Sequence, residues 1–263
     1  MLLRIVSILF PLVAVVLLGY VVARRAKPDL SDVNKLNMDV FTPALILSAL
    51  AARDVDLSGY GAMLGAMLAI IVGSGLVAWA VARAAGMQPK TLVPPMMFNN
   101  VGNLGLPIAL LAFGEQALAP AAVMLTVTNV VHFSFGAWLL DHHTKLTTVW
   151  RSPLIIAAAI GITVAATGFQ VWPPLLTAIR MIGDMSIPLM LFALGARIAT
   201  SRISALGFGI FGAVLRPVVG MLLAWLLLLF IDLPDRERGL LWIFGALPPA
   251  VLNYMFAERY NQE

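Results

Sequence analysis

The chain has 263 residues, of which 61% are hydrophobic and 11% are charged, and its formal net charge is +4. Soluble domains contain about 45–50% apolar and about 25% charged residues, so a soluble fold of this length would leave too much apolar surface in water. The basic residues lie between apolar runs and form no single patch, which argues against nucleic-acid binding. The absence of cysteine excludes disulfides and thiolate catalysis.

Apolar stretches long enough to cross a bilayer, which takes about 20 residues, recur along the chain. We predict nine spans, at residues 3–23, 35–52, 60–82, 91–114, 117–140, 153–170, 176–197, 204–231 and 239–257. The first span is interpreted as a retained helix, because no cleavage site of small residues precedes Arg24 and Arg25. The loops are short, so we expect an all-α polytopic membrane protein with one compact domain.

Lysine and arginine are distributed unevenly between the two sides of this topology. The turns after the first, third, fifth and seventh spans carry ten basic residues, against five on the opposite side. Cytoplasmic loops are enriched in lysine and arginine. The bias therefore predicts a multi-pass protein of the cell (inner or plasma) membrane with its N-terminus outside.

Two segments of the chain resemble each other, at residues 39–53 and 184–197. Both read Asp-x-x-x-Pro followed by Ala-Leu-small-Ala-Arg, and their first residues lie 145 positions apart. The copies lie in the second and seventh predicted spans, five steps apart in span order, so they run in opposite directions, as in the inverted repeats of secondary transporters. We predict a first repeat at 1–150, with helices one to five, and a second at 151–263, with helices six to nine. Symmetry predicts a tenth helix after the end of this chain, which we interpret as a truncation.

Two predicted spans are interrupted by glycine and proline, at residues 99–107 and 245–253. Proline removes a backbone donor, and opened backbone at membrane depth is tolerated only where it lines a cavity. Free N–H groups at the start of a half-helix suit a carboxylate. Simple kinks are common in membrane helices, but the asparagine amides favour a binding site. The candidate substrate-binding residues are Asn99, Asn100, Gly102, Asn103, Pro107, Pro248, Pro249 and Asn253.

At these residues the sequence resembles the auxin efflux carrier family, which includes bacterial malonate-type carriers and plant PIN proteins. The similar segments are residues 99–107, 187–196 and 248–254. The resemblance implies two inverted five-helix repeats whose broken fourth and ninth helices cross near the midplane. It also implies that substrate binds at the crossing and that a transport domain moves against a scaffold like an elevator.

Carried over by position, the resemblance implies that Pro107 and either Pro248 or Pro249 are the crossing prolines. It further implies that Asn103, with Asn99 or Asn100, faces the substrate carboxylate.

Four ionisable residues inside predicted spans are candidates for ion coupling, because charge in a bilayer is costly. Desolvation would let Asp39 and Asp184 carry protons, but both could instead be solvated at helix ends. Arg216 could attract an anion or an aspartate, or its side chain could extend to the membrane interface or to a lipid. His132 could relay protons or pack against a helix carbonyl.

These patterns predict a secondary active transporter of small organic anions, such as malonate-like or auxin-like carboxylates. An ion or solute channel, or a membrane receptor with the same fold, is the alternative. The sequence carries no Gly-x-Ser-x-Gly or His-Glu-x-x-His motif, so we expect no enzyme, and we expect no cofactor and no metal site. The expected partners are the anion and the lipid bilayer, without nucleic acid. Proton coupling, sodium coupling and a homodimer are left open.

Overall fold

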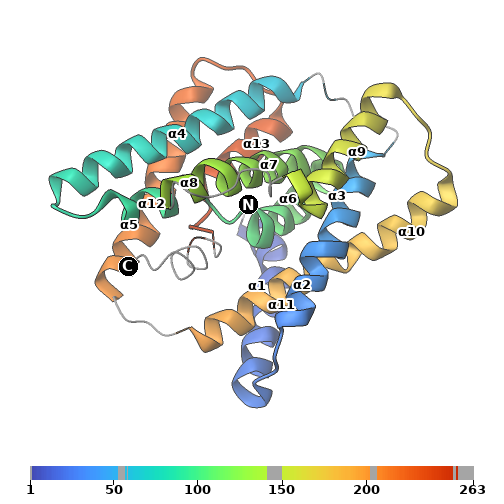
Figure 1. The fold of residues 1–263 in the computed structure, drawn as a ribbon, viewed down its shortest axis with the longest axis horizontal. Coiled ribbons are helices and arrows are strands. Elements are labelled where there is room, and N and C mark those ends of the chain that lie inside the picture. Colours follow the sequence, from blue (N-terminus) through green and yellow to red (C-terminus); the bar gives the residue numbers. More distant parts are fainter. Residues whose placement is uncertain are drawn as a thin grey trace. The chain divides into compact units, whose positions relative to one another are not determined.

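The computed structural model describes residues 2–52, 57, 59–140, 150–201, 206–250 and 253, and within these ranges the secondary structure is helical (Figure 1). Among the described residues, five helices are long and apolar enough to cross a membrane: Ile5–Ala26, Tyr60–Ala84, Glu115–Gly136, Pro173–Thr200 and Gly209–Leu228. Val101–Phe113 and Pro153–Thr167 are shorter apolar helices. The prediction of an all-α, multi-pass membrane protein is confirmed at this level, whereas its orientation and its membrane stay predictions.

The chain folds into two compact units, where the short loops had led us to expect one. Unit 1 comprises Met1–Leu57, Gly102–Thr126 and Trp150–Ile203, and unit 2 comprises Ser58–Val101, Val127–Val149 and Ser204–Glu263. The chain leaves each unit and returns to it, so sequence neighbours do not share one core. Each predicted repeat contributes to both units, and the repeats themselves stay a prediction.

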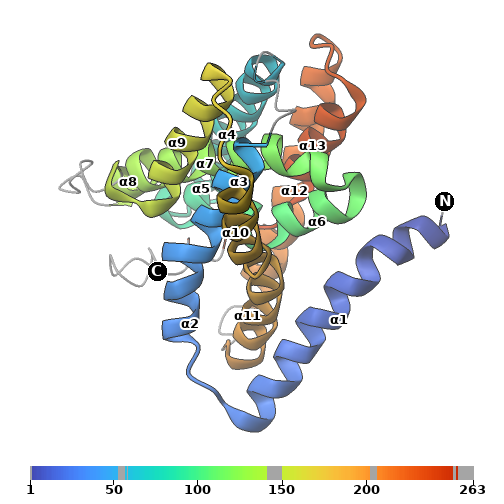
Figure 2. The same cartoon turned by 90° about the vertical axis from the view of Figure 1, so that its right-hand side faces the viewer.

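Unit 1 contains the helices that precede and follow the two similar sequence segments. Its helices are α1 (Leu2–Ala26), α2 (Ser31–Leu36), the π-helix η1 (Asn37–Phe41), α3 (Thr42–Leu50), α6 (Leu106–Phe113), the short 3-10 helix η3 (Glu115–Ala117), α9 (Pro153–Thr167), α10 (Pro173–Asp184) and α11 (Ser186–Thr200). Helix α1 packs along α11, and α3 packs against α9 and α10 (Figure 2). The helices η2 (Val101–Gly105) and α7 (Leu118–Val131) each run across a boundary between the units.

Glycines allow the helices of unit 1 to approach backbone to backbone. A β-carbon on Gly195 would overlap the carbonyl oxygen of Val16, and one on Gly19 would overlap that of Phe192. A β-carbon on Gly183 would lie 2.6 Å from the α-carbon of Leu45. Such close approaches are typical of membrane helices, whose association depends on van der Waals packing of small residues.

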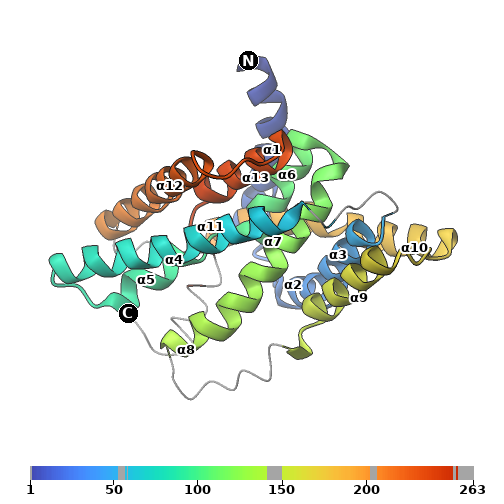
Figure 3. The same cartoon turned by 90° about the horizontal axis from the view of Figure 1, so that it is seen from above.

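Unit 2 is built around α4 (Tyr60–Ala84), which packs against α5 (Pro89–Met97), α12 (Leu206–Leu228) and α13 (Asp235–Ala246) (Figure 3). Its remaining helices are the π-helix η4 (His132–Gly136) and α8 (Ala137–Leu140). Helix α13 begins four residues before the predicted ninth span and ends within it. Leu247 takes an extended conformation, as expected of a residue before proline.

Candidate functional site

Two extended segments pair where helices α5 and α13 end, both within unit 2. Residues 98–100 and 248–250 lie antiparallel, with a bridge between Asn99 and Pro249. The backbone N–H of Asn100 donates to Pro248 O at 2.9 Å, and that of Ala250 donates to Phe98 O at 2.9 Å. We call residues 98–100 and 248–250 the paired segments. They bring together residues that sequence analysis had selected from two distant spans.

Two asparagine side chains hold the paired segments to the neighbouring helix ends. Asn99 Nδ2 donates to Phe244 O at 2.5 Å, and Asn253 Nδ2 donates to Phe98 O at 2.9 Å. Because a carbonyl oxygen can only accept, these partners fix which end of each amide is the nitrogen. The side-chain oxygen of Asn99 is therefore left over. Asn99 is 2% exposed, and this oxygen has no hydrogen-bond partner among the described residues.

The consecutive prolines explain why the end of α13 needs side-chain donors. In a continuing helix, the carbonyl groups of Phe244 and Gly245 would accept from the N–H groups of residues 248 and 249. Both of those residues are proline and have no N–H. Asn99 donates to the first carbonyl, and Arg216 Nη1 donates to the second at 3.0 Å.

Arg216 is fully buried, although it lies within the membrane-spanning part of α12. Its Nε and second Nη have no hydrogen-bond partner in the described part of the chain. A β-carbon on Gly220, one turn further along α12, would overlap both Arg216 Nη1 and Gly245 O. The guanidinium group therefore lies in a space that exists because residue 220 is glycine.

His132 contacts Phe98, the first residue of the paired segments. Its ring stacks on the Phe98 ring, with centroids 4.1 Å apart and planes 8° from parallel. His132 begins the π-helix η4, and Gly136 ends it. A β-carbon on Gly136 would lie 2.7 Å from the Phe98 ring, so glycine is needed there for the stacking.

The remaining predicted site residues lie in unit 1. Gly102, Asn103 and Pro107 fall beyond the boundary that follows Val101. Asp39 is exposed within η1, and Asp184 is the exposed last residue of α10. Ion coupling through these carboxylates stays a prediction.

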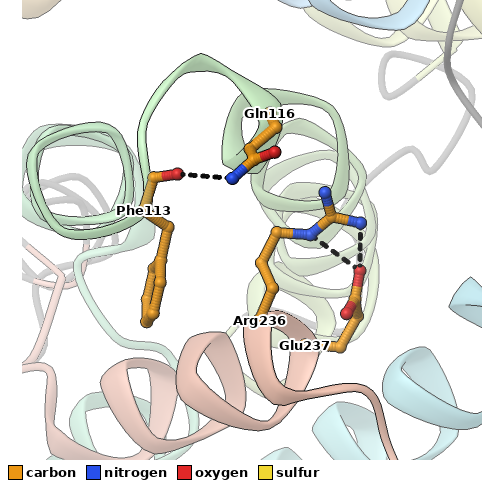
Figure 4. Close-up of polar contacts among 4 residues, drawn as sticks. All are labelled: Phe113, Gln116, Arg236 and Glu237. Atoms are coloured by element: carbon orange, nitrogen blue, oxygen red, sulfur yellow. Dashed lines mark hydrogen bonds and ion pairs between the residues drawn. The ribbon is translucent and has the colours of Figure 1, made fainter.

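Sequence analysis missed a buried ion pair at the start of α13. Arg236 donates from Nε at 3.0 Å and from Nη2 at 2.6 Å to Glu237 Oε1 (Figure 4). The Glu237 side chain is only 3% exposed. The predicted ninth span began at residue 239, so Glu237 had been counted as a loop residue. The sequence feature that could have identified it is its position in an acidic first helical turn, which the helix dipole favours. In the described ranges, no group of three or more metal-ligating side chains is placed to hold an ion.

Comparisons with known proteins agree with the resemblance found in the sequence. Residues 142–263 match the family described as "Membrane transport protein". An uncharacterized transporter of Methanocaldococcus jannaschii is 26% identical over 187 residues, which cover 65% of this chain and 58% of that protein. A Rhizobium meliloti protein, provisionally named as a malonate transporter, is 25% identical over 217 residues, which cover 74% of this chain and 67% of that protein.

The alignments with the two relatives cover 65% and 74% of this chain. Both are longer than either predicted repeat, so each alignment extends into both repeats. The chain spans less than two thirds of the first relative's length and about two thirds of the second's. The family resemblance is confirmed at this level: residues 142–263, just under half of the chain, are similar to the family of membrane transport proteins, and both relatives are named as transporters.

Proposed function

We propose that the protein is a secondary transporter of small carboxylates, and that the substrate binds at the paired segments of unit 2. The observation that carries the proposal is the pairing of two extended segments, residues 98–100 and 248–250, through reciprocal hydrogen bonds. Non-helical backbone at membrane depth is tolerated where it is enclosed by protein or lines a cavity, which makes it a favoured place for a substrate. The relative named as a malonate transporter supports the anion class.

Two side-chain contacts support the proposed inverted repeats. Contacts near a two-fold axis join equivalent positions of two repeats, so the residue numbers of the partners differ by about the repeat offset. The offset between the similar sequence segments is 145 residues. Thr42 and Ser186 in unit 1 share a buried hydrogen bond of 2.9 Å across 144 residues, and Asn99 and Phe244 in unit 2 are joined across 145 residues.

The division into units supports an elevator-type mechanism, in which one unit carries the substrate and the other stays fixed. Each predicted repeat begins in unit 1 and ends in unit 2; the first repeat also returns to unit 1 at Gly102–Thr126, whereas the second changes unit once. Two bodies that both draw on the two inverted repeats would allow rigid movement of one against the other. Unit 2 contains the paired segments and is the proposed moving body.

The proposal predicts saturable uptake of labelled malonate by proteoliposomes that contain the purified full-length protein. Asn99→Ala should lower the initial rate about tenfold per folded molecule, since it removes a buried hydrogen bond next to the site. Asn34→Ala, at an exposed position in α2, is the matched control and should transport normally. The proposal fails if the wild-type protein moves no carboxylate. Currents that far exceed carrier turnover would instead support the alternative channel.

A further inference from the structure

We propose that Arg216 forms the cationic end of the substrate site in unit 2, and that Asn99 Oδ1 accepts a hydrogen bond from the same substrate. The ligand would be a small acid that carries one carboxylate and one N–H or O–H donor, such as the monoanion or the monoamide of a short dicarboxylic acid. This inference rests on the proposed function, because it specifies the substrate class of the same site.

The first argument is the charge of Arg216. Its side chain is fully buried in a membrane-spanning helix, and none of the ion pairs among the described residues includes it. Of the five N–H donors of a guanidinium group, the only described hydrogen bond uses one, to the neutral carbonyl of Gly245. A buried cation without a partner is strongly destabilising, so an anion at this position would relieve a large desolvation cost.

The second argument is that the surrounding backbone is shaped to hold the guanidinium group. Gly220 leaves the space that Arg216 Nη1 occupies, and a β-carbon on Gly245 would lie 2.6 Å from Gly220 O. Helices α12 and α13 therefore meet at two glycines, with the guanidinium group directed at the last turn of α13. This position differs from that of an arginine whose side chain extends to the membrane interface, which was the alternative from sequence.

Asn99 and Arg216 donate to the carbonyl groups of neighbouring residues. Their acceptors, Phe244 O and Gly245 O, belong to consecutive residues, whose α-carbons lie about 3.8 Å apart. Asn99 Oδ1 is an acceptor and would repel a carboxylate, whereas Arg216 offers donors and positive charge. A ligand that satisfies both needs a donor next to its carboxylate, at the separation found within a small acid. Because Arg216 is fully buried, binding must accompany an opening of α12 from α13.

The inference can be tested by calorimetric titration of the purified full-length protein with three probes. The first is malonic acid monoamide, which has a carboxylate and an N–H donor. The second is the monomethyl ester of malonic acid, which has a carboxylate but no donor. The third is the neutral diamide of malonic acid. We expect the monoamide to bind wild type most tightly and the diamide not to bind. Arg216→Gln should weaken monoamide binding about ten- to hundredfold, the effect of losing a charge-assisted hydrogen bond. Arg180→Gln, which removes an exposed ion pair with Glu115 in unit 1, is the matched control and should bind normally.

The outcomes separate this inference from the proposed function. Equal binding by Arg216→Gln and wild type would overturn the inference and leave carboxylate transport standing. If the wild-type protein neither binds nor transports any carboxylate, the inference and the proposed function are both wrong. If Arg216→Gln does not fold, wild type alone decides: a diamide that binds as tightly as the monoamide refutes the cationic site, and a monomethyl ester that binds as tightly as the monoamide refutes the role of Asn99.

An internal partner for Arg216 would also overturn the inference. Glu258 is a carboxylate of the same chain that lies outside the described residues. If it neutralised Arg216, Glu258→Gln would destabilise the ligand-free protein in the wild-type background but not in the Arg216→Gln background, which is the signature of a coupled pair. We expect equal effects in the two backgrounds.

Discussion

Asn99 and Asn253 should contribute unequally to stability. After truncation to alanine, the carbonyl that accepts from Asn253 keeps a second donor, whereas the carbonyl that accepts from Asn99 does not. Asn253→Ala removes one of two donors to Phe98 O, since the backbone N–H of Ala250 still donates at 2.9 Å. Asn99→Ala removes the donor that replaces the missing N–H of Pro248, so Phe244 O loses its described partner. Both side chains are buried, and both substitutions delete the same atoms, so the cavity terms largely cancel.

The expected difference follows from the cost of an unsatisfied buried group. Hydrogen bonds between membrane helices contribute about 0.6 kcal/mol on average, which is the expected effect of Asn253→Ala. A buried carbonyl left without a partner costs about 1–3 kcal/mol, which applies to Asn99→Ala. The difference of about 1 kcal/mol or more corresponds to about 2–4 °C in melting temperature for a chain of this size.

Tryptophan fluorescence during thermal unfolding in detergent measures this difference directly. Asn34→Ala, at an exposed site, controls for loss of an asparagine side chain and should melt like wild type. The reasoning is refuted if Asn253→Ala lowers the melting temperature as much as Asn99→Ala, or more. That result would mean that Phe244 O accepts from another donor. Pro248 and Pro249 would then impose no requirement for a side-chain donor at the end of α13.

Two further predictions concern the units themselves. Gly195→Ala should destabilise the protein by about 1–3 kcal/mol in a thermal melt, because the new β-carbon would overlap Val16 O. Gly65→Ala is the control and should not destabilise the protein, because the space around Gly65 is open. Equal melting temperatures of the two variants would contradict the backbone contact at Gly195. The chain has no native cysteine, so Ala250→Cys in unit 2 and Ser48→Cys in unit 1 can be labelled singly with impermeant maleimide. An elevator predicts that malonate changes the labelling rate of the first and not of the second; a change at neither position would argue against movement of unit 2.

The sequence was sufficient to select residues of the paired segments, because glycine, proline and asparagine in an uncharged span are conspicuous. Asn99, Pro248 and Pro249 were selected for that reason, and the structure brings all three together. His132 was assigned to packing or proton relay from its position in a span. Its stacking on Phe98 depends on the π-helix η4, which shifts the helical register and has no clear sequence signature.

The division into units could not be predicted from the sequence, because it depends on contacts between distant segments. Asn99 and Asn103 are four residues apart and were assigned to one site, yet the boundary between the units lies between them, after Val101. Sequence proximity cannot indicate such a boundary where the chain passes from one packed body into another. The substrate-facing role that the resemblance implied for Asn103 therefore stays a prediction, separate from the paired segments.

Pro248 and Pro249, which follow α13, connect the local sequence to the chemistry of the proposed site. Each proline removes the donor for the carbonyl four residues earlier, and in a bilayer no water replaces it. Two consecutive prolines thus require two donors from outside α13, which Asn99 and Arg216 provide. A neutral amide is sufficient at Phe244, so a neutral side chain would also be sufficient at Gly245. The positive charge of Arg216 exceeds this structural requirement, and the proposed binding of an anion would account for it.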